Sequence, residues 1–571
     1  MSIRHRIDVA AGRKPADLVL GNARVVSVLA DRVLETDVAI ADGVIVGFGS
    51  YRAKGRIDLR GGYLSSGLID SHLHIESTLL SPQEFARTVL PKGTTSVVAD
   101  PHEIANVLGA DGVRWMLKAS EGLPLDIYIV LPSCVPASKF ESSGYKLGAK
   151  ELARLAKLPG VIGIGEVMDD PGVIAARKDL LAKIRLIPGM RVDGHAPGLT
   201  GKELYAYIVA GIHSDHESTK AAEAREKLMA GLHIMIREGT TEKNLNEIAK
   251  IVTPANSHRC FFCSDDRSAH DLVTDGHMDD ILRRAVAARI PPVTALQMAT
   301  NNAPYYFRIK SRKGAVAVGY AADLVVFDDL KRFNARMVFK DGRLVAQDGE
   351  LLVPCRSKAG KGRAGQMRVK GLDEARFRIR SRGSRARVRV MCVYPGQIAT
   401  GEERVAMKTP GGVIESDVDR DILKLAVIER HHGTGRVGLG LVRGFGLRAG
   451  ALASTICHDA HNLIVVGTSD EDMLAAAKAL MKSGGGLAAA AGGKVLDVLP
   501  LPIAGLMSNN PAEETASAYD ALGRISHDLG TRIPNPFLAL SFMGLSVVPE
   551  LKLTDRGLVD VRARKIVPLI V

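Results

Sequence analysis

Apolar and polar positions follow two different rhythms in the first part of the chain. Between residues 63 and 307, eight short apolar runs alternate with segments whose apolar residues recur every three or four positions. The short runs predict buried strands and the segments between them predict helices. The eight runs are 64–70, 94–100, 126–132, 161–167, 191–195, 211–215, 232–237 and 259–265. Eight strand–helix units in 245 residues predict a (β/α)8 barrel (a TIM barrel), with a doubly wound open sheet as the alternative.

Short strands and tight turns flank this region on both sides. Residues 18–58 contain three predicted strands separated by turns such as Ala41-Asp42-Gly43. A similar pattern returns at 314–352, where Asp341-Gly342 is a strong hairpin signal. We therefore expect 1–62 and 308–355 to pair into one small β-sandwich, with the barrel at 63–307 inserted between its two segments.

Strands and helices alternate again in the last third of the chain. The run RVRVMCVY predicts a strand, residues 471–482 predict a helix, and 422–429 have mixed character. We expect 372–571 to form a C-terminal α/β domain, joined to the rest by a basic linker at 356–371.

Composition and charge narrow the class of protein. The chain has 571 residues, of which 46% are hydrophobic and 24% charged, and this excludes a mainly disordered chain. No apolar run reaches the roughly 18–20 residues that span a bilayer, so we expect no membrane association. The basic N-terminal stretch lacks the apolar core of a secretory signal. Six cysteines are too few for a disulfide scaffold, which predicts a reducing, cytoplasmic setting.

The net charge of +13 is concentrated in one segment. Residues 356–389 hold thirteen Lys or Arg and two acids, so the rest of the chain is close to neutral. We interpret the segment as solvated chain, since Phe377 is its one aromatic residue and base stacking is poorly supported. The alternative is a nucleic-acid or other polyanion site, which would bind in a salt-sensitive manner.

Candidate chemistry gathers at the predicted strand ends. Ten of the sixteen histidines lie between residues 63 and 307. Barrel active sites form at the C-terminal ends of the strands, where imidazoles and carboxylates would meet at one mouth. Such side chains bind divalent first-row metals, and two metals fit if one carboxylate bridges them. The strand-end residues are His72, His74, Glu166, His195, His216, Asp265 and Asp266.

These motifs resemble the amidohydrolase superfamily, and within it most closely the bacterial adenine deaminase family. The similar stretches are GLIDSHLHIESTLLSPQEFA (67–86), GTTSVVADPHEIANVLG (93–109), GIGEVMD (163–169), DGHAPGL (193–199), SDHEST (214–219), HDAHNLIVVGTSDEDM (458–473) and LPIAGLMS (501–508). The basic linker has no counterpart in the resemblance. Members of the superfamily carry the barrel inside a small β-sandwich, which agrees with the patterning.

The resemblance implies a binuclear metal centre and a reaction. His72, His74 and Asp265 would hold one metal, His195 and His216 the second, and Glu166 would bridge them; Asp266 is the alternative to Asp265. A metal-activated hydroxide would attack C6 of adenine, giving hypoxanthine and ammonia in adenine catabolism and purine salvage. Asp265 would act as the general base. Mn²⁺ or Fe²⁺ would serve as the metals, with Zn²⁺ as a further candidate.

Two more groups of polar residues are candidates for contacts with the purine. Asp100, His102 and Glu103 follow the second strand, and the latter two would supply the acid that protonates a ring nitrogen. Their alternative role is structural, in helix capping or in supporting the metal ligands. His458 and His461 in the C-terminal segment either reach the barrel mouth, bind a further ion, or form a structural polar cluster or a subunit contact.

The strongest alternative function keeps the barrel and changes the substrate. It is another amidohydrolase-type reaction, on a cyclic amide or a different aminopurine. We expect a homodimer or higher homo-oligomer from the frequency of symmetric assemblies.

Overall fold

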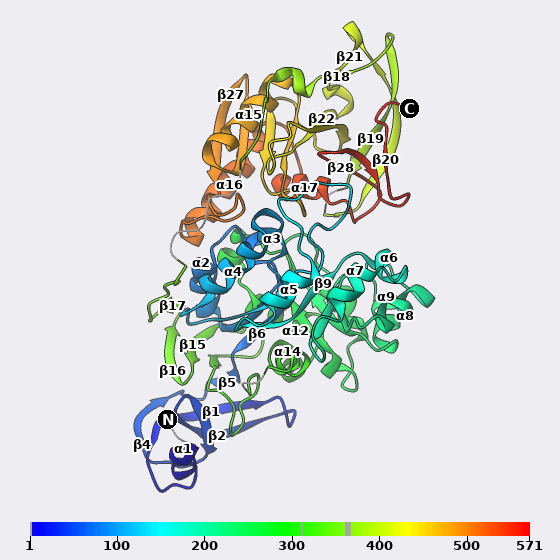
Figure 1. Ribbon diagram of the computed structural model, residues 1–571. Coiled ribbons are helices and arrows are strands. Elements are labelled where there is room, and N and C mark those ends of the chain that lie inside the picture. Colours follow the sequence, from blue (N-terminus) through cyan, green and yellow to red (C-terminus); the bar gives the residue numbers. More distant parts are fainter. Residues whose placement is uncertain (1–2, 310–311, 360–366, 395) are drawn as a thin grey trace.

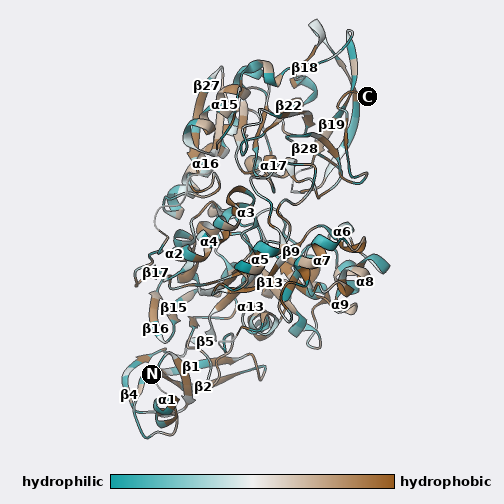
Figure 2. Cartoon of the chain, viewed as in Figure 1, coloured by the Kyte–Doolittle hydropathy of each residue, from teal (hydrophilic) through white to brown (hydrophobic). Residues whose placement is uncertain are grey.

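The computed structural model describes residues 3–309, 312–359, 367–394 and 396–571. Figure 1 shows three regions stacked along the molecule: a β-sheet that holds the N-terminus, a central region of parallel strands covered by helices, and a C-terminal region. Apolar segments, brown in Figure 2, are concentrated in the strands of each region. The central region therefore has neighbours on two opposite sides.

The eight strands expected in the central region are all present and all parallel. Five form a curled sheet in the order β10-β9-β8-β7-β6, and three form a second sheet in the order β11-β12-β13. Backbone hydrogen bonds cross both gaps between these sheets: His213 N donates to Val192 O (3.0 Å), and Asp265 N donates to His72 O (3.0 Å). The bounds are β6 Leu68–Leu73, β7 Thr94–Ala99, β8 Asp126–Leu131, β9 Val161–Val167, β10 Arg191–Gly194, β11 Ser214–Asp215, β12 His233–Arg237 and β13 Cys260–Cys263.

Helices follow the strands and pack around them (Figure 1). Residues 241–251 have helical spacing in the sequence but form only the short helix α10, because Gly239 N donates to Glu242 O and Asn244 N to Arg237 O, which closes a turn ahead of it. No helix in the described ranges is both long and apolar enough to cross a bilayer. The bounds are α2 Pro82–Val89, α3 His102–Leu108, α4 Ala110–Ser120, α5 Ala149–Leu155, α6 Asp170–Ile174, α7 Lys178–Ile184, α8 Gly201–Val209, α9 Ala221–Met229, α10 Leu245–Ile248, α11 Ala269–Thr274, α12 Met278–Ala287, α13 Pro292–Thr300 and α14 Asn302–Phe307.

Both flanks of the central region contribute strands to one sheet. Its order is β17-β16-β15-β14-β5-β1-β2-β3, with β4 beside β1. Strand β5 pairs with β1 on one side and β14 on the other, so it joins the two flanks. At the predicted hairpin, Asp341 and Gly342 both have positive φ (49° and 75°), as a tight two-residue turn requires. The bounds are α1 Ile3–Ala10, β1 Ala16–Ser27, β2 Arg32–Ala41, β3 Val44–Phe48, β4 Ala53–Asp58, β5 Tyr63–Ser66, β14 Leu324–Phe327, β15 Ala335–Lys340, β16 Arg343–Gln347 and β17 Glu350–Leu351.

The C-terminal region is built on an eight-stranded sheet. Its order is β20-β19-β23-β22-β25-β24-β26-β27. The stretch of mixed character at 422–429 is the central strand β22, and every residue of it is buried, which explains the absence of alternation. The bounds are β18 Ile379–Arg380, β19 Arg385–Val393, β20 Thr400–Lys408, β21 Val413–Ile414, β22 Ile422–Ile428, β23 Val437–Arg443, β24 Ala451–Ser454, β25 Leu463–Gly467, α15 Asp470–Ser483, β26 Gly486–Ala491, β27 Lys494–Pro500, α16 Ala512–Asp528, α17 Pro536–Ser541, β28 Leu551–Thr554, β29 Gly557–Asp560 and β30 Lys565–Val567.

The basic segment lies partly outside the described residues, which omit 360–366. On its N-terminal side, Ser357 N donates to Gln83 Oε1 (3.0 Å) on α2. On its C-terminal side, Met367 and Val369 pack against the apolar cluster under α15. In β19, Arg385 and Arg387 are exposed and alternate with buried apolar residues. Part of the described positive charge thus lies on the outward face of a folded strand.

Candidate metal centre

The strand ends bring the predicted metal ligands together. His72 is in β6 and His74 follows it, so their i, i+2 spacing directs both imidazoles to one side. Asp265 follows β13 and lies beside β6, because Asp265 N donates to His72 O (3.0 Å) and His74 N donates to Asp265 O (3.2 Å). Asp265 has a positive φ of 54°, and this turn in the chain ends the strand at the cluster.

Glu166 lies between two groups of histidines. Its Oε1 is 3.2 Å from His74 Nε2, and its Oε2 is 2.6 Å from His195 Nδ1 and 3.3 Å from His216 Nε2. On the first side, Asp265 Oδ1 lies 3.2 Å from His74 Nε2 and 3.5 Å from His72 Nε2. All six side chains have ligand atoms in one small volume, and Glu166 presents one oxygen to each group.

The donors fit divalent cations. Both ring nitrogens of His72 and Nδ1 of His216 are buried without a hydrogen-bond partner among the described residues. Burial lowers the pKa of His72, so its imidazole is neutral and keeps a free lone pair. Burial works against the charge of Glu166, yet the neighbouring histidines lower its pKa well below the usual value. Burial also works against the charge of Asp265, but His72, His74 and Arg237 lower its pKa well below the usual value. Neutral imidazoles and ionised carboxylates are the ligands such metals take.

Asp100 orients two of these ligands from behind the cluster. Its carbonyl oxygen lies 2.9 Å from His74 Nδ1, and because a carbonyl only accepts, Nδ1 carries the proton and Nε2 faces the centre. Its carboxylate accepts from Glu166 N (3.0 Å). A Cβ on Gly165 would lie 2.0 Å from that carboxylate, so only glycine fits there. Of the candidates for purine contact, Asp100 is thus placed behind the ligands.

His102 and Glu103, at the start of α3, reach the same pocket. His102 Nδ1 is 3.2 Å from Glu166 Oε1, and its Nε2 is 3.8 Å from Asp459 Oδ1. Burial opposes charge on His102, but Glu166 and Asp100 raise its pKa to about 10. Burial also raises the pKa of Glu103.

The C-terminal region covers the mouth of the cluster. The pocket around the ligands is lined on that side by Ile398, His458, Asp459, Phe542 and Leu545. The His458 ring stacks on Phe542 with centroids 5.1 Å apart, and its Nδ1 lies 3.4 Å from Glu103 Oε1.

His461 is placed differently from His458. It is fully buried, does not line the pocket, and its Nε2 is 4.0 Å from Glu103 Oε2.

Arg237 and Glu217, which were not predicted from the sequence, lie beside the metal ligands and support them. Arg237, at the end of β12, donates through Nη1 to Asp265 Oδ2 (2.8 Å) and to Glu217 Oε1, and through Nη2 to Glu217 Oε2 (3.1 Å). Arg237 closes the apolar run 232–237 and Glu217 follows His216, so the strand-end rule that selected the histidines could also have selected both.

Comparisons with known proteins agree along the whole chain. Residues 63–345 match the model of the amidohydrolase family, and residues 397–565 match that of the adenine deaminase C-terminal domain. The protein named adenine deaminase 2 from Carboxydothermus hydrogenoformans is 46% identical over 568 residues, which cover 99% of each chain. The adenine deaminase of Desulfatibacillum aliphaticivorans is 46% identical over 565 residues, again 99% of each chain. A solved β-aspartyl dipeptidase from Fervidobacterium islandicum is 18% identical with a TM-score of 0.45, and the match covers 60% of this chain and 99% of that one.

Proposed function

Because the chain belongs to the adenine deaminase family of the amidohydrolase superfamily, we propose that it hydrolyses adenine to hypoxanthine and ammonia. The observation that carries the proposal is Glu166, whose two oxygens face two separate groups of histidines. The strand-4 segment that contains it, IGIGEVMDD, has no lysine that could act as a carboxylated bridge instead.

We assign the ligands as the resemblance implied. His72, His74 and Asp265 would hold one divalent ion, His195 and His216 would hold the second, and Glu166 would supply a ligand oxygen to each. When bound, such ions supply Lewis-acid chemistry that makes a water nucleophilic near neutral pH. Mn²⁺ or Fe²⁺ are the proposed metals and Zn²⁺ is a further candidate, since all three accept imidazole and carboxylate ligands.

The chain's own residues handle the protons. Asp265 takes the proton of the attacking water and passes it to the departing ammonia; Arg237 holds the other carboxylate oxygen and so fixes the direction of the group. A ring nitrogen must gain a proton as C6 becomes tetrahedral, and His102 and Glu103 are the donors proposed for it. Both line the pocket, whereas Asp100 and His461 support it from behind.

We also propose the closed barrel, the domain boundaries, the assembly and the cellular setting of the protein. Because backbone hydrogen bonds cross both gaps between the two parallel sheets, we propose one closed (β/α)8 barrel at 63–307. Residues 1–62 and 308–355 would form one domain, since Ala322 N donates to Gly43 O (2.8 Å) and apolar residues of β2 and β15 share a cluster. Residues 372–571 would form the third domain, after the linker at 356–371. A homo-oligomer and a cytoplasmic setting are also proposed; all six cysteines lie in described ranges and are free.

The decisive experiment is ammonia release from adenine. Protein reconstituted with Mn²⁺ is compared with a chelated sample, and the ultraviolet change to hypoxanthine is followed in parallel. Metal-dependent release of both products establishes the reaction. Protein that carries about two metals per chain but releases no ammonia rules out adenine, and cyclic amides and other aminopurines are then assayed.

A further inference from the structure

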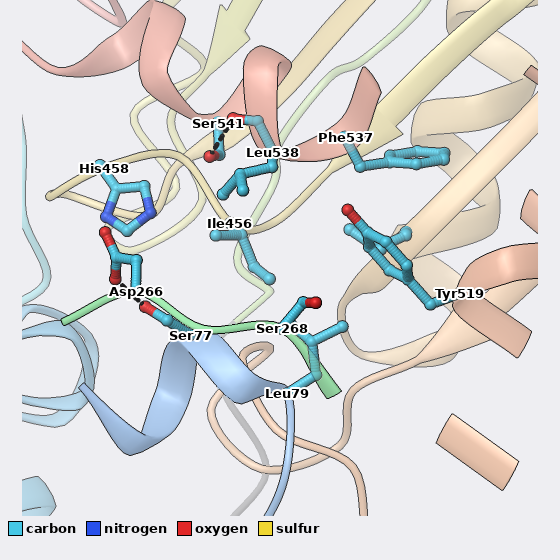
Figure 3. A pocket seen from close by; sticks show the side chains of 11 residues that line it. Ser77, Leu79, Asp266, Ser268, Ile456, His458, Tyr519, Phe537, Leu538 and Ser541 are labelled. Atoms are coloured by element: carbon cyan, nitrogen blue, oxygen red, sulfur yellow. Dashed lines mark hydrogen bonds between the residues drawn. The ribbon is translucent and has the colours of Figure 1, made fainter. Parts of the chain in front are cut away.

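A second pocket lies directly beside the metal-ligand cluster. It is formed where the central and C-terminal regions meet, and it shares Asp266 and His458 with the pocket of the cluster. Figure 3 shows these two side chains together at one end, with Tyr519 and Phe537 at the other. We call this pocket the side chamber; its apolar walls are Leu79, Ile456, Leu487, Tyr519, Phe537 and Leu538.

The two ends of the side chamber differ in chemistry. At the end near the cluster, Ser77 Oγ lies 2.5 Å from Asp266 Oδ1 and 3.0 Å from Glu103 Oε1, and the His458 imidazole faces the same carboxylates. This end offers both donors and acceptors. The far end presents aliphatic and aromatic surfaces, of which Phe537 and Leu487 are 2% and 1% exposed. The side chamber therefore complements a flat ligand that has apolar faces and a polar edge.

The walls of the side chamber are fixed relative to the cluster. Helix α16, which carries Tyr519, is tied to α11 by His270 Nδ1 and Asp520 Oδ2 (2.9 Å). The same helix is tied to α2 by Arg87 and Glu513 (3.2 Å). Ser508 N donates to Leu79 O (2.7 Å) across the same boundary. These contacts join the C-terminal walls of the side chamber to the helices beside the cluster.

A further cleft that borders the cluster pocket is unsuited to bind a neutral heterocycle. This cleft shares Met168 with the cluster pocket, and charged side chains line it, among them Asp169, Arg177, Lys183 and Arg564. Covering those groups with an apolar ring face would remove their water without replacing its hydrogen bonds. Water is better matched to that cleft, whose lining has more basic than acidic side chains.

We propose that the side chamber is the purine subsite. The ring faces lie between its apolar walls, the nitrogen edge meets Ser77, Asp266 and His458, and C6 points to the ligand cluster. This inference rests on the proposed function and adds the location of the substrate. It makes the C-terminal region a contributor to substrate selectivity, because five of the six apolar walls come from it.

The test enlarges one side of the site at a time in the metal-loaded, full-length enzyme. Leu538→Ala enlarges the side chamber, and the matched control Leu545→Ala enlarges the cluster pocket at a residue that does not line the side chamber. Adenine is compared with 2-methyl-, 8-methyl- and 9-methyladenine. Leu538→Ala should raise kcat/KM for at least one methylated base relative to adenine by about tenfold or more, whereas Leu545→Ala should change that ratio less than about twofold.

A variant that fills the side chamber gives a second measurement. It avoids the loss of protein stability that a new cavity can cause. Leu538→Trp should raise KM for adenine about tenfold or more at unchanged metal content. With the enzyme chelated, equilibrium dialysis should show weaker hypoxanthine binding by Leu538→Trp than by the wild type.

The outcomes separate the inference from the function on which it rests. If the wild type deaminates adenine but Leu545→Ala, and not Leu538→Ala, changes the selectivity, the side-chamber inference is wrong and the function stands. If Leu538→Trp keeps the wild-type KM and hypoxanthine binding, the inference is equally refuted. If metal-loaded wild type leaves adenine intact, the proposed function fails, and the purine subsite fails with it.

Discussion

Lys227 ties together the two chain segments that carry His195 and His216. Its ammonium group is fully buried and lies 2.9 Å from Asp215 Oδ2, next to His216. It also donates to Ala196 O (2.6 Å), the residue after His195, and to Glu223 Oε1 (2.7 Å). Lys227→Met keeps the length of the side chain and removes all three contacts, which leaves the Asp215 carboxylate buried without its cation.

The expected cost follows from burial. Removing one partner of a buried ion pair costs about 3–5 kcal/mol, because the other charge stays desolvated. For a unit the size of the central region, each kcal/mol lowers the melting temperature by about 2–4 °C, so the variant should melt about 6–20 °C lower. The segments that carry His195 and His216 also lose a common anchor, so the second metal should bind more weakly.

The assay is thermal unfolding of chelated protein followed by circular dichroism, with metal content measured after reconstitution. Lys250→Met is the matched control, because Lys250 is 63% exposed and its contact with Glu247 lies at the surface. An exposed pair contributes about 0–1 kcal/mol, so this control should melt within about 4 °C of the wild type. Equal melting temperatures for the two variants would refute the reasoning, and so would a full second equivalent of metal in Lys227→Met.

Three further predictions concern the ligands and the cover of the site. Glu166→Gln keeps the shape of the bridge but not its charge, so metal content and ammonia release should fall together; both metals retained with full turnover would contradict the assignment. Arg237→Met leaves Asp265 and Glu217 facing each other, so the chelated variant should melt lower than the wild type, and added Mn²⁺ should narrow the difference. Lys552 is buried, donates to Ile398 O (2.6 Å) and Phe542 O (3.0 Å), and burial lowers its pKa to about 7. Unfolded lysine holds its proton to about pH 10.4, so between the two values the unfolded state binds more protons and stability should rise with pH by at most about 1.4 kcal/mol per unit. Lys552→Met should lack that rise between pH 7 and 9, and parallel melting curves for the two proteins would contradict the shifted pKa.

Periodicity predicted the elements that position the site, because strand ends are local features of the chain. His72, Glu166 and His216 each lie at the end of an apolar run, and a parallel sheet brings such ends to one edge. The resemblance to the adenine deaminase family, made on those motifs, is confirmed by the comparisons.

What the sequence did not reveal depends on contacts between distant segments. The pairing of Arg237 with Asp265 requires the direction of two side chains from different strands, which spacing alone does not give. The approach of Asp459 to His102 requires the docking of the C-terminal region on the mouth. The strand over 422–428 had no alternation to read, since both of its faces are buried.

The charge balance of the pocket favours the binding of cations. Its lining contains seven carboxylic acids, Glu103, Glu166, Glu217, Glu242, Asp265, Asp266 and Asp459, against one permanently charged cation, Arg237. Such an excess of negative charge away from water is tolerated only if some acids hold protons or cations sit among them. Both responses are indicated, because burial raises the pKa of Glu242 to about 7, while Glu166 and Asp265 have lowered pKa values and stay ionised. Neighbouring cationic groups also lower the pKa of Glu217 and of Asp459 against the effect of burial, whereas burial raises the pKa of Glu103. In the metal-free pocket the raised pKa values of His102 (about 10), His195 (about 9) and His458 (about 9) place positive charge beside these carboxylates, and divalent ions held near Glu166 and Asp265 would take over that role.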